Sequence, residues 1–350
     1  MTDSLFMFCL VVPLAGYLFW GITVLPRERW QIFAAIPVRK LDDRQWNGVN
    51  LTWYGILTAN AYVAAVALLF LLMGAVQVPF AGVAVLAAAM LAVCVPASRL
   101  VAVVVEKKAH TFTVGGAVFV GVLLAPWLVL LVNRLLGSML NFYVPPAATL
   151  AAFAIAYAFG EGLGRLACIS FGCCYGKPLR AAHPLLRRLF ARRSFVFHGA
   201  TRKISYAGGL EGTEVVPVQA LTAILYVGCG LAGIALFLHA SFGSSFILVM
   251  AVTQGWRVLS EMLRDDYRGG GKVSAYQVMG VVAILYGSGA ILLAHDAALS
   301  APDTAAGLVT LWHPAPLIFL QGIWLAILRY TGLSTVTGAT LSFHVHQDRI

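Results

Sequence analysis

Residues 162–178 read Gly162-Leu163-Gly164-Arg165-Leu166-Ala167-Cys168-Ile169-Ser170-Phe171-Gly172-Cys173-Cys174-Tyr175-Gly176-Lys177-Pro178, and here a long apolar segment ends and the most basic loop begins. An arginine at the end of a membrane helix is costly unless it meets an anion or a carboxylate. The glycines permit close approach of a helix or ligand to the backbone, and Pro178 stops a continuing helix. The stretch predicts either an anion site or a glycine-rich helix end with a snorkelling arginine.

The composition excludes an ordinary soluble domain. Of the 350 residues, 60% are hydrophobic and 11% are charged, and the mean hydropathy is +0.86, whereas soluble domains carry about 25% charged residues. We therefore expect an all-α polytopic membrane protein. The net charge of +10 comes from basic residues between apolar spans, which is typical of a cytoplasmic membrane surface rather than of nucleic-acid binding.

Eight or nine apolar segments are near the length needed to cross the hydrocarbon core of a bilayer. We expect spans at 5–25, 51–73, 78–98, 113–134, 147–165, 216–238, 245–263 and 273–294, with a shorter ninth candidate at 314–328. The first run lacks the basic n-region and the cleavage site of a signal peptide, so we expect it to stay as an anchor.

These spans divide the chain into three parts. We expect residues 1–50 to form the anchor helix and an interfacial segment, residues 51–294 a membrane core, and residues 295–350 a short hydrophobic segment and a tail. Within the core, residues 166–215 form the one connection long enough for a small extramembrane head domain. Two pieces of it, 195–197 and 203–206, read as short strands.

Lys and Arg lie on one side of the predicted spans. The connections at 26–50, 105–112, 166–215 and 264–272 contain five, two, eight and three of them, and parity places all four on the same side. The opposite connections, at 74–77, 135–146, 239–244 and 295–313, contain none. The positive-inside rule therefore predicts a cytoplasmic head domain and an N-terminus outside.

The six cysteines give no disulfide pattern. Three lie inside apolar segments, and three, Cys168, Cys173 and Cys174, lie near the central loop. A metal site there is the sharper alternative, but adjacent cysteines rarely bind one metal together. We expect no metal and no cofactor, and the sequence leaves the reactivity of these thiols open.

Two arginines in the apolar segments predict the chemistry. Arg257 and Glu261 lie one helical turn apart, as do Glu161 and Arg165, so each glutamate either neutralises or orients its arginine. Arg165 and Arg257 fall at the same membrane end by parity. Because guanidinium groups bind phosphate oxygens in pairs and keep their charge, the two predict a clamp for a phosphodiester.

Other polar residues are weaker candidates. Tyr54, in Trp53-Tyr54-Gly55 at the start of a span, is either part of an interfacial aromatic belt or a hydrogen-bond donor to a phosphate. His110 and His198 are candidate general bases, although exposed histidines are more often simply solvated.

The motifs resemble the prolipoprotein diacylglyceryl transferases, integral membrane enzymes of the bacterial inner membrane. The resemblance covers about residues 50–294 in order and spacing. The matching motifs are Trp53-Tyr54-Gly55, Gly164-Arg165 to Gly172, Tyr175-Gly176, Val216-Pro217-Val218-Gln219, and Trp256-Arg257 to Glu261 and Arg264.

The resemblance implies transfer of a diacylglyceryl group from phosphatidylglycerol to the thiol of a prolipoprotein cysteine, with release of glycerol phosphate. It implies that Arg165 and Arg257 hold the lipid phosphate, supported by Tyr54 and Glu261. The positions that it assigns to substrate binding are Gly164, Gly172, Tyr175, Gly176, Lys177, Gln219, Arg264, Gly115 and Gly116.

The chain departs from the family pattern at several functional positions. Val114 stands where the family has its histidine, and Cys168, Cys173 and Lys177 replace an asparagine, a glutamate and an arginine. The extra span at 5–25 reverses the core, as the charge distribution also predicts. The acceptor is a prolipoprotein by family resemblance, or a polar small molecule or other nucleophile on the cytoplasmic side if the core is reversed. The alternative is an inactive phospholipid-binding or lipid-transporting relative.

Overall fold

The computed structural model describes residues 3–28, 31–106, 114–137, 139, 141–265, 273–294 and 301–350. In this part of the chain, nine helices are long and apolar enough to cross a membrane, which confirms the predicted spans and the ninth candidate. They are α1 (Asp3–Val24), α2 (Trp53–Ala75), α3 (Phe80–Glu106), α4 (Val114–Val132), α6 (Pro146–Phe171), α9 (Val218–Leu238), α10 (Phe242–Leu263), α11 (Ala275–Leu293) and α13 (Pro314–Gly332). A π-helical turn, η1 (Asn133–Gly137), follows α4, and a short helix, α12 (Thr304–Leu311), precedes α13.

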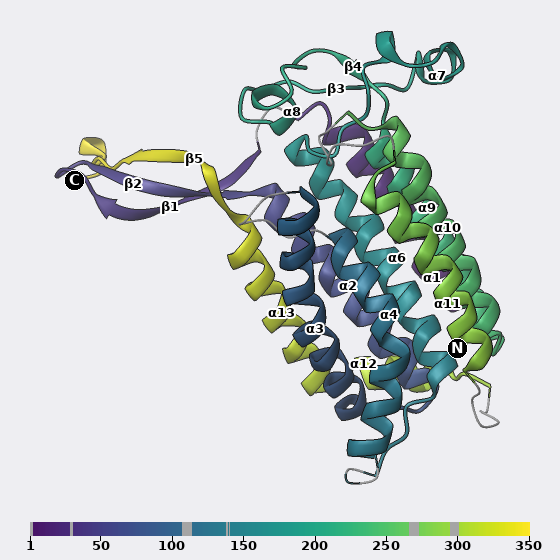
Figure 1. The fold of residues 1–350 in the computed structure, drawn as a ribbon. Helices are drawn as coiled ribbons and strands as arrows, with labels where there is room; N and C mark the ends of the chain where they lie inside the picture. Colours follow the sequence, from purple (N-terminus) through teal and green to yellow (C-terminus); the bar gives the residue numbers. More distant parts are fainter. Residues whose placement is uncertain are drawn as a thin grey trace.

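Helix α6 lies at the centre of the bundle (Figure 1). It packs against α2, α9 and α10, and 72% of the residues in its most apolar 18-residue stretch are buried. Its alanines and glycines allow this close packing, since membrane helices associate through small residues. At Gly162, a Cβ atom would come within 3.0 Å of the Tyr226 side chain on α9. Helix α6 therefore carries its polar residues into the centre of the protein.

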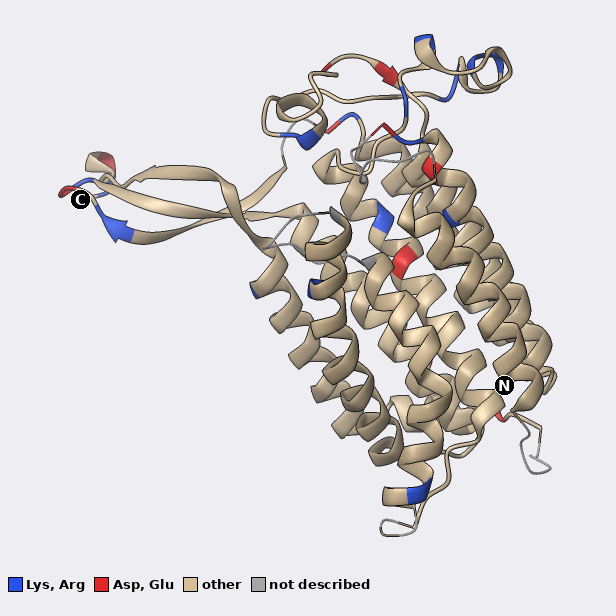
Figure 2. Cartoon of the chain, viewed as in Figure 1, with Lys and Arg blue, Asp and Glu red and all other residues tan. Residues whose placement is uncertain are grey.

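The helix directions place the basic connections at one end of the bundle. Figure 1 shows the segment after α6 at the end where α1, α3 and α10 also finish, and the N-terminus at the opposite end. Lys and Arg gather at the first end (Figure 2). The ends of α1, α3, α6 and α10 therefore lie together, as the predicted parity requires. Arg134, exposed in η1, is a basic residue at the opposite end.

A small head covers this end of α6. It contains a 3₁₀ turn, η2 (Leu179–Ala181), two short helices, α7 (Pro184–Phe190) and α8 (Lys203–Tyr206), and an antiparallel strand pair, β3 (Phe195–Val196) and β4 (Glu214–Val215). The strand predicted at 195–197 is confirmed over two residues. The strand predicted at 203–206 is wrong, because Tyr206 and Ala207 donate helical hydrogen bonds to Arg202 and Lys203.

Arg202 fastens the head to the bundle. Its guanidinium donates hydrogen bonds to the carbonyls of Ile169 (3.1 Å), Leu25 (3.0 Å) and Glu28, at the ends of α6 and α1. The side chain lies over the Phe197 ring and is 1% exposed. Burial lowers the pKa of Arg202 to about 10, and Glu28 partly opposes this shift. The anchor helix and the head are therefore joined through one buried cation.

A three-stranded sheet extends sideways from the bundle (Figure 1). Its strands are β1 (Ile32–Lys40), β2 (Gln45–Thr52) and β5 (Leu333–Ser342), in the order β1-β2-β5 and all antiparallel. The Asp42 carboxylate closes the β1–β2 turn by accepting two backbone hydrogen bonds of 2.7 Å. The interfacial segment expected at 26–50 thus contains a β-hairpin, and the tail supplies the third strand.

Candidate functional site

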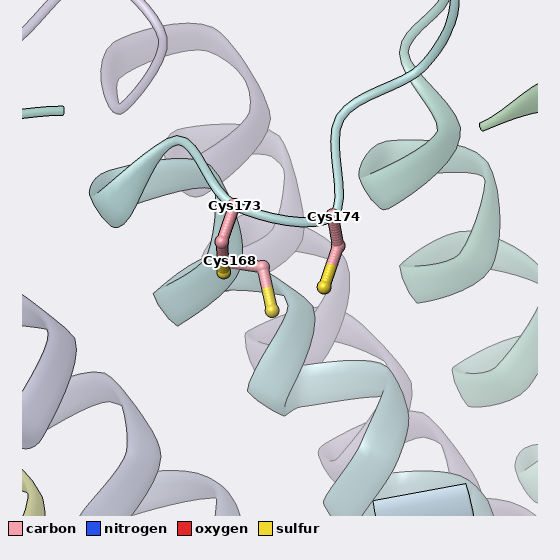
Figure 3. Close-up of side chains that lie close together, drawn as sticks. All are labelled: Cys168, Cys173 and Cys174. Atoms are coloured by element: carbon pink, nitrogen blue, oxygen red, sulfur yellow. The ribbon is translucent and has the colours of Figure 1, made fainter. Parts of the chain in front are cut away.

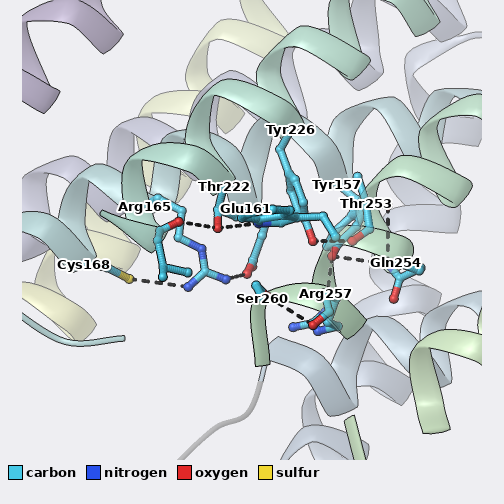
Figure 4. Close-up of polar contacts among 12 residues, drawn as sticks. Tyr157, Glu161, Arg165, Cys168, Thr222, Tyr226, Thr253, Gln254, Arg257 and Ser260 are labelled. Atoms are coloured by element: carbon cyan, nitrogen blue, oxygen red, sulfur yellow. Dashed lines mark hydrogen bonds and ion pairs between the residues drawn. The ribbon is translucent and has the colours of Figure 1, made fainter. Parts of the chain in front are cut away.

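Three helices turn polar side chains toward one place near the head (Figure 4). Helix α6 contributes Tyr157, Glu161, Arg165 and Cys168, which are spaced three or four residues apart and so share one face. Helix α9 contributes Gln219, Thr222 and Tyr226 with similar spacing, and α10 contributes Gln254, Arg257, Ser260, Glu261 and Arg264. The shared periodicity brings the polar faces of three apolar helices together.

These faces enclose a narrow pocket. Its walls are Arg165, Cys174, Val218, Gln219, Thr222, Tyr226, Arg257, Ser260, Glu261 and Arg264. The cavity volume is about 10 Å³, which is room for about one water molecule. Five predicted site residues, Arg165, Arg257, Glu261, Gln219 and Arg264, lie in this wall, so the structure brings together residues that are up to 99 positions apart in the chain.

Arg165 is paired with Glu161 on its own helix. The two side chains form an ion pair, and they are only 12% and 8% exposed. Arg165 Nη1 also lies 4.0 Å from the Sγ atom of Cys168, while its buried Nε has no hydrogen-bond partner among the described residues. Glu161 therefore holds one edge of the guanidinium, which leaves donor capacity on another edge.

Arg257 is held from the opposite side of the pocket. Its Nη1 donates a hydrogen bond of 3.2 Å to the Tyr157 hydroxyl, and this hydroxyl also lies 3.4 Å from the Gln254 amide nitrogen. This hydrogen bond joins α10 to α6.

Gln219 and the neighbouring hydroxyl groups stiffen the other walls. The Gln219 amide nitrogen donates to the Cys173 carbonyl (2.9 Å), while its buried Oε1 has no partner within the described chain. Tyr226 donates to the Thr253 carbonyl (2.7 Å), and the Trp256 indole donates to the Thr222 hydroxyl (2.8 Å). The bonds of Tyr226 and Trp256 join α9 to α10, and the bond of Gln219 joins α9 to the loop after α6.

The charge balance of the site favours an anion. Three arginines, Arg165, Arg257 and Arg264, face two glutamates, Glu161 and Glu261. Guanidinium groups present donors in a fork that matches phosphate or carboxylate oxygens. Preorganised charges of this kind stabilise negative charge that develops during a reaction.

Tyr54 lies outside this wall. Its ring packs edge-on against Phe171 at 5.5 Å, and its hydroxyl lies near the three cysteines after α6. Gly164 faces α2, where a Cβ atom would make an ordinary contact of 3.9 Å with Ala61. Neither residue contacts the pocket that joins the two arginines.

Four predicted binding residues shape the loop after α6. Gly172 ends the helix with a φ of +68°, and a Cβ atom at Gly176 would lie 2.3 Å from the Val216 carbonyl oxygen. Tyr175 is 6% exposed, and the backbone N–H of Lys177 donates to the Leu263 carbonyl (2.9 Å). These residues hold the loop against α9 and α10, and they do not line the pocket.

His198 does not line the pocket. His198 is exposed in the head, and His110 lies outside the described residues. Gly115 and Gly116 are both buried at the start of α4. A Cβ atom at Gly115 would lie 2.7 Å from the Tyr276 ring and 3.2 Å from Arg257 Nη2, so the absence of a side chain there makes room for the guanidinium.

Sequence reasoning missed several residues of the site. These are Tyr157, Thr222, Tyr226, Gln254 and Ser260. The signal was present for Tyr157, which precedes Glu161 by one helical turn and Arg165 by two. A search for polar residues at helical spacing from each arginine would have found the α6 and α10 faces.

Three thiols lie beside Arg165. The Sγ atoms of Cys168, Cys173 and Cys174 approach one another closely (Figure 3). Hydrogen bonds from Cys168 and Cys173, with the charges of Arg264 and Arg165, hold the pKa of the Cys174 thiol well below its usual value. Hydrogen bonds with Cys168 and Cys174, together with burial, raise the pKa of the Cys173 thiol. The three thiols therefore differ in acidity although they lie close together.

Comparison with protein families identifies a relationship for most of the chain. The family model for prolipoprotein diacylglyceryl transferase matches residues 45–293, from β2 to the end of α11. No curated protein matches the chain. Helix α1, strand β1 and the segment from α12 to β5 lie outside the matched region.

The contact between Gly115 and Arg257 predicts a difference between two glycine substitutions. Gly115→Ala adds a methyl group against Tyr276 and Arg257, whereas Gly228→Ala on α9 adds one where no atom lies within 4 Å. Both changes gain similar helix propensity. We expect Gly115→Ala to lose about 1–3 kcal/mol relative to Gly228→Ala, because it overpacks the core. Thermal unfolding in detergent measures this, and equal midpoints would contradict the packing.

Proposed function

The chain belongs to the prolipoprotein diacylglyceryl transferase family, and from this premise we propose that it moves a diacylglyceryl group from a phospholipid such as phosphatidylglycerol to a nucleophilic acceptor. Its family makes it a transferase, and the nine long apolar helices among the described residues make it a multi-pass membrane protein. One observation carries the finer proposal. Arg165 on α6 and Arg257 on α10 line the same buried pocket, at the head end of the bundle.

The pocket chemistry supports a phosphodiester donor. Among the described residues, the buried Nε of Arg165 has no hydrogen-bond partner, and Nη1 of Arg257 donates to the neutral Tyr157 hydroxyl. A lipid phosphate is larger than the present cavity of about 10 Å³. We therefore expect the phosphate to displace Glu161 from Arg165 as it enters, so that one ion pair of the guanidinium replaces another.

The proposed reaction is a displacement at the glycerol carbon that carries the phosphate. The acceptor forms a bond to this carbon, and the carbon–oxygen bond to the phosphate breaks. The departing phosphate monoester gains negative charge, which Arg165 and Arg257 stabilise. The acceptor must lose a proton, and Glu161, Glu261 and Cys174 are the proton acceptors at the described pocket.

The orientation of the head decides between two acceptors. The family default is a prolipoprotein cysteine, which is presented on the periplasmic side of the membrane after secretion. The basic connections at the head end support a cytoplasmic head by the positive-inside rule, and this orientation favours a polar nucleophile in the cytoplasm. We place the protein in the bacterial inner membrane, as the family resemblance implies.

A second candidate function is binding of a phospholipid without turnover. Val114 occupies the position of the family histidine. The candidate base His198 is exposed in the head. Such a relative would bind a phospholipid in the arginine pocket but would not catalyse transfer of its diacylglyceryl group.

Substitution of the two arginines tests the transferase. We expect Arg165→Ala and Arg257→Ala each to reduce transfer from phosphatidylglycerol about 10²–10³-fold, because each removes one charge that stabilises the leaving phosphate. Arg257→Lys keeps the charge but lacks the fork, so we expect an intermediate loss. Transfer is measured by mass spectrometry of the product with purified protein.

Arg192→Ala is the control, since Arg192 is exposed in the head and is not among the residues that line the pocket. Full transfer by well-folded Arg165→Ala and Arg257→Ala proteins would contradict the clamp. Tightly bound phospholipid with no transfer to any acceptor in the unsubstituted protein would instead support the binding relative.

Single reporter cysteines test the orientation. Ala200 in the head and Ala305 in α12 are both exposed and lie at opposite ends of the bundle. With an impermeant maleimide on intact cells, we expect Ala305→Cys to be labelled and Ala200→Cys to be protected. The unsubstituted chain is the background control. Labelling of Ala200→Cys alone would restore the family orientation and the prolipoprotein acceptor.

A further inference from the structure

Three cysteines converge at the end of α6, beside the arginine pocket (Figure 3). The Sγ atoms of Cys168, Cys173 and Cys174 all lie within 4.8 Å of one another, and all three thiols are free. Cys168 belongs to the last turn of α6, and the other two belong to the loop that follows. Neither cofactor nor metal was expected from the sequence, because two of the three residues are adjacent.

The backbone explains how adjacent cysteines face the same point. Gly172 reverses the chain with a φ of +68°, and the Cys173 N–H then donates to the Cys168 carbonyl (3.1 Å). Cys174 has a φ of +56°, in the left-handed region that non-glycine residues rarely adopt. In an extended chain successive side chains point to opposite sides. The unusual conformation of Cys174 therefore turns its thiol toward Cys168 and Cys173.

The surrounding structure holds this conformation from outside the cluster. Gln219 on α9 donates to the Cys173 carbonyl (2.9 Å), and the Lys177 N–H donates to Leu263 at the end of α10 (2.9 Å). Gly176 and Arg264 form a bridge between the loop and the segment after α10. The three thiols are thus preorganised by contacts from two helices, which is what a metal site needs and what a mobile loop lacks.

The dimensions and charges suit a zinc ion. Tetrahedral zinc–thiolate bonds of about 2.3 Å place sulfur atoms about 3.8 Å apart. The thiols are therefore within about 1 Å of ligand positions. Three thiolates and one Zn²⁺ carry a net charge of −1, and Arg165 lies 4.0 Å from Cys168 while Arg264 lines the same wall as Cys174. These arginines offset the remaining charge in a buried place.

The ligand count indicates a reactive site. Within the described residues, no fourth histidine, cysteine, aspartate or glutamate joins the group. Zinc sites with three protein ligands and one open position are typical of catalysis, whereas structural sites have four. Cys174 itself lines the pocket that contains Arg165 and Arg257, so an open position would face the proposed lipid phosphate.

We propose that Cys168, Cys173 and Cys174 bind one Zn²⁺, and that the open position takes the sulfur of a thiol acceptor. The second part rests on the proposed transferase function. Coordination would hold the acceptor as a thiolate after its proton passes to Glu261 or to solvent. The thiolate sulfur then bonds to the glycerol carbon as the carbon–oxygen bond to the phosphate breaks. The products are a thioether and a phosphate monoester, so no oxidant or further reactant is needed.

Metal content and cobalt spectroscopy test the site without any lipid. The protein is purified in mild detergent without chelators, and we expect about one zinc per chain by elemental mass spectrometry. After zinc removal, added Co²⁺ should give the intense sulfur-to-cobalt charge-transfer band of a tetrahedral thiolate site. We expect Cys173→Ser to lose both signals. Cys229→Ser is the matched control, since Cys229 is buried in α9 away from the cluster, and it should keep both.

Several results would overturn the proposal. One is the absence of both zinc and the cobalt band while all six cysteines titrate as free thiols. Another is a disulfide between two members of the cluster in protein purified without reductant. Because these readouts need no lipid transfer, they are independent of the arginine variants. For the acceptor, a cysteine-containing peptide should shift the cobalt spectrum, and an unchanged spectrum would contradict the open thiol position.

Discussion

Burial of guanidinium groups inside an apolar bundle is the constraint on which this structure depends. An isolated charge is costly in a membrane interior, so each arginine needs a partner on a neighbouring face. Arg165 takes Glu161 from its own helix, and Arg257 takes Tyr157 from α6. Both contacts require α6 to lie at the centre of the bundle. Its small residues, including Gly162, allow α9 to approach closely enough to complete the walls.

The membrane topology was readable from the sequence, because hydrophobic length and the distribution of Lys and Arg are local properties. Eight spans and a shorter ninth candidate were predicted, and the two arginines were predicted to lie at the same end. The pairing of residues 45–52 with 333–342 was not predictable, since strand register across the whole chain leaves no local pattern. Residues 203–206 alternate like a strand but form one helical turn, because four residues fit either period.

The site was predicted in part for the same reason. The charged members of the α6 and α10 faces stand out in apolar segments, whereas Tyr157 and Tyr226 do not, because tyrosines are common in membrane helices. The convergence of the cysteines depends on a positive φ at Cys174, and no sequence pattern predicts a positive φ for a non-glycine residue. The loop glycines were read as binding residues, but Gly172 and Gly176 shape the backbone around the cluster.

The central prediction is that a lipid phosphate binds between α6 and α10. The most direct measurement is the structure of the protein in nanodiscs that contain phosphatidylglycerol. We predict headgroup density between the two arginines, with phosphate oxygens about 3 Å from both guanidinium groups and with Glu161 displaced from Arg165. Headgroup density elsewhere, with the Arg165–Glu161 and Arg257–Tyr157 contacts unchanged, would contradict the proposed donor site.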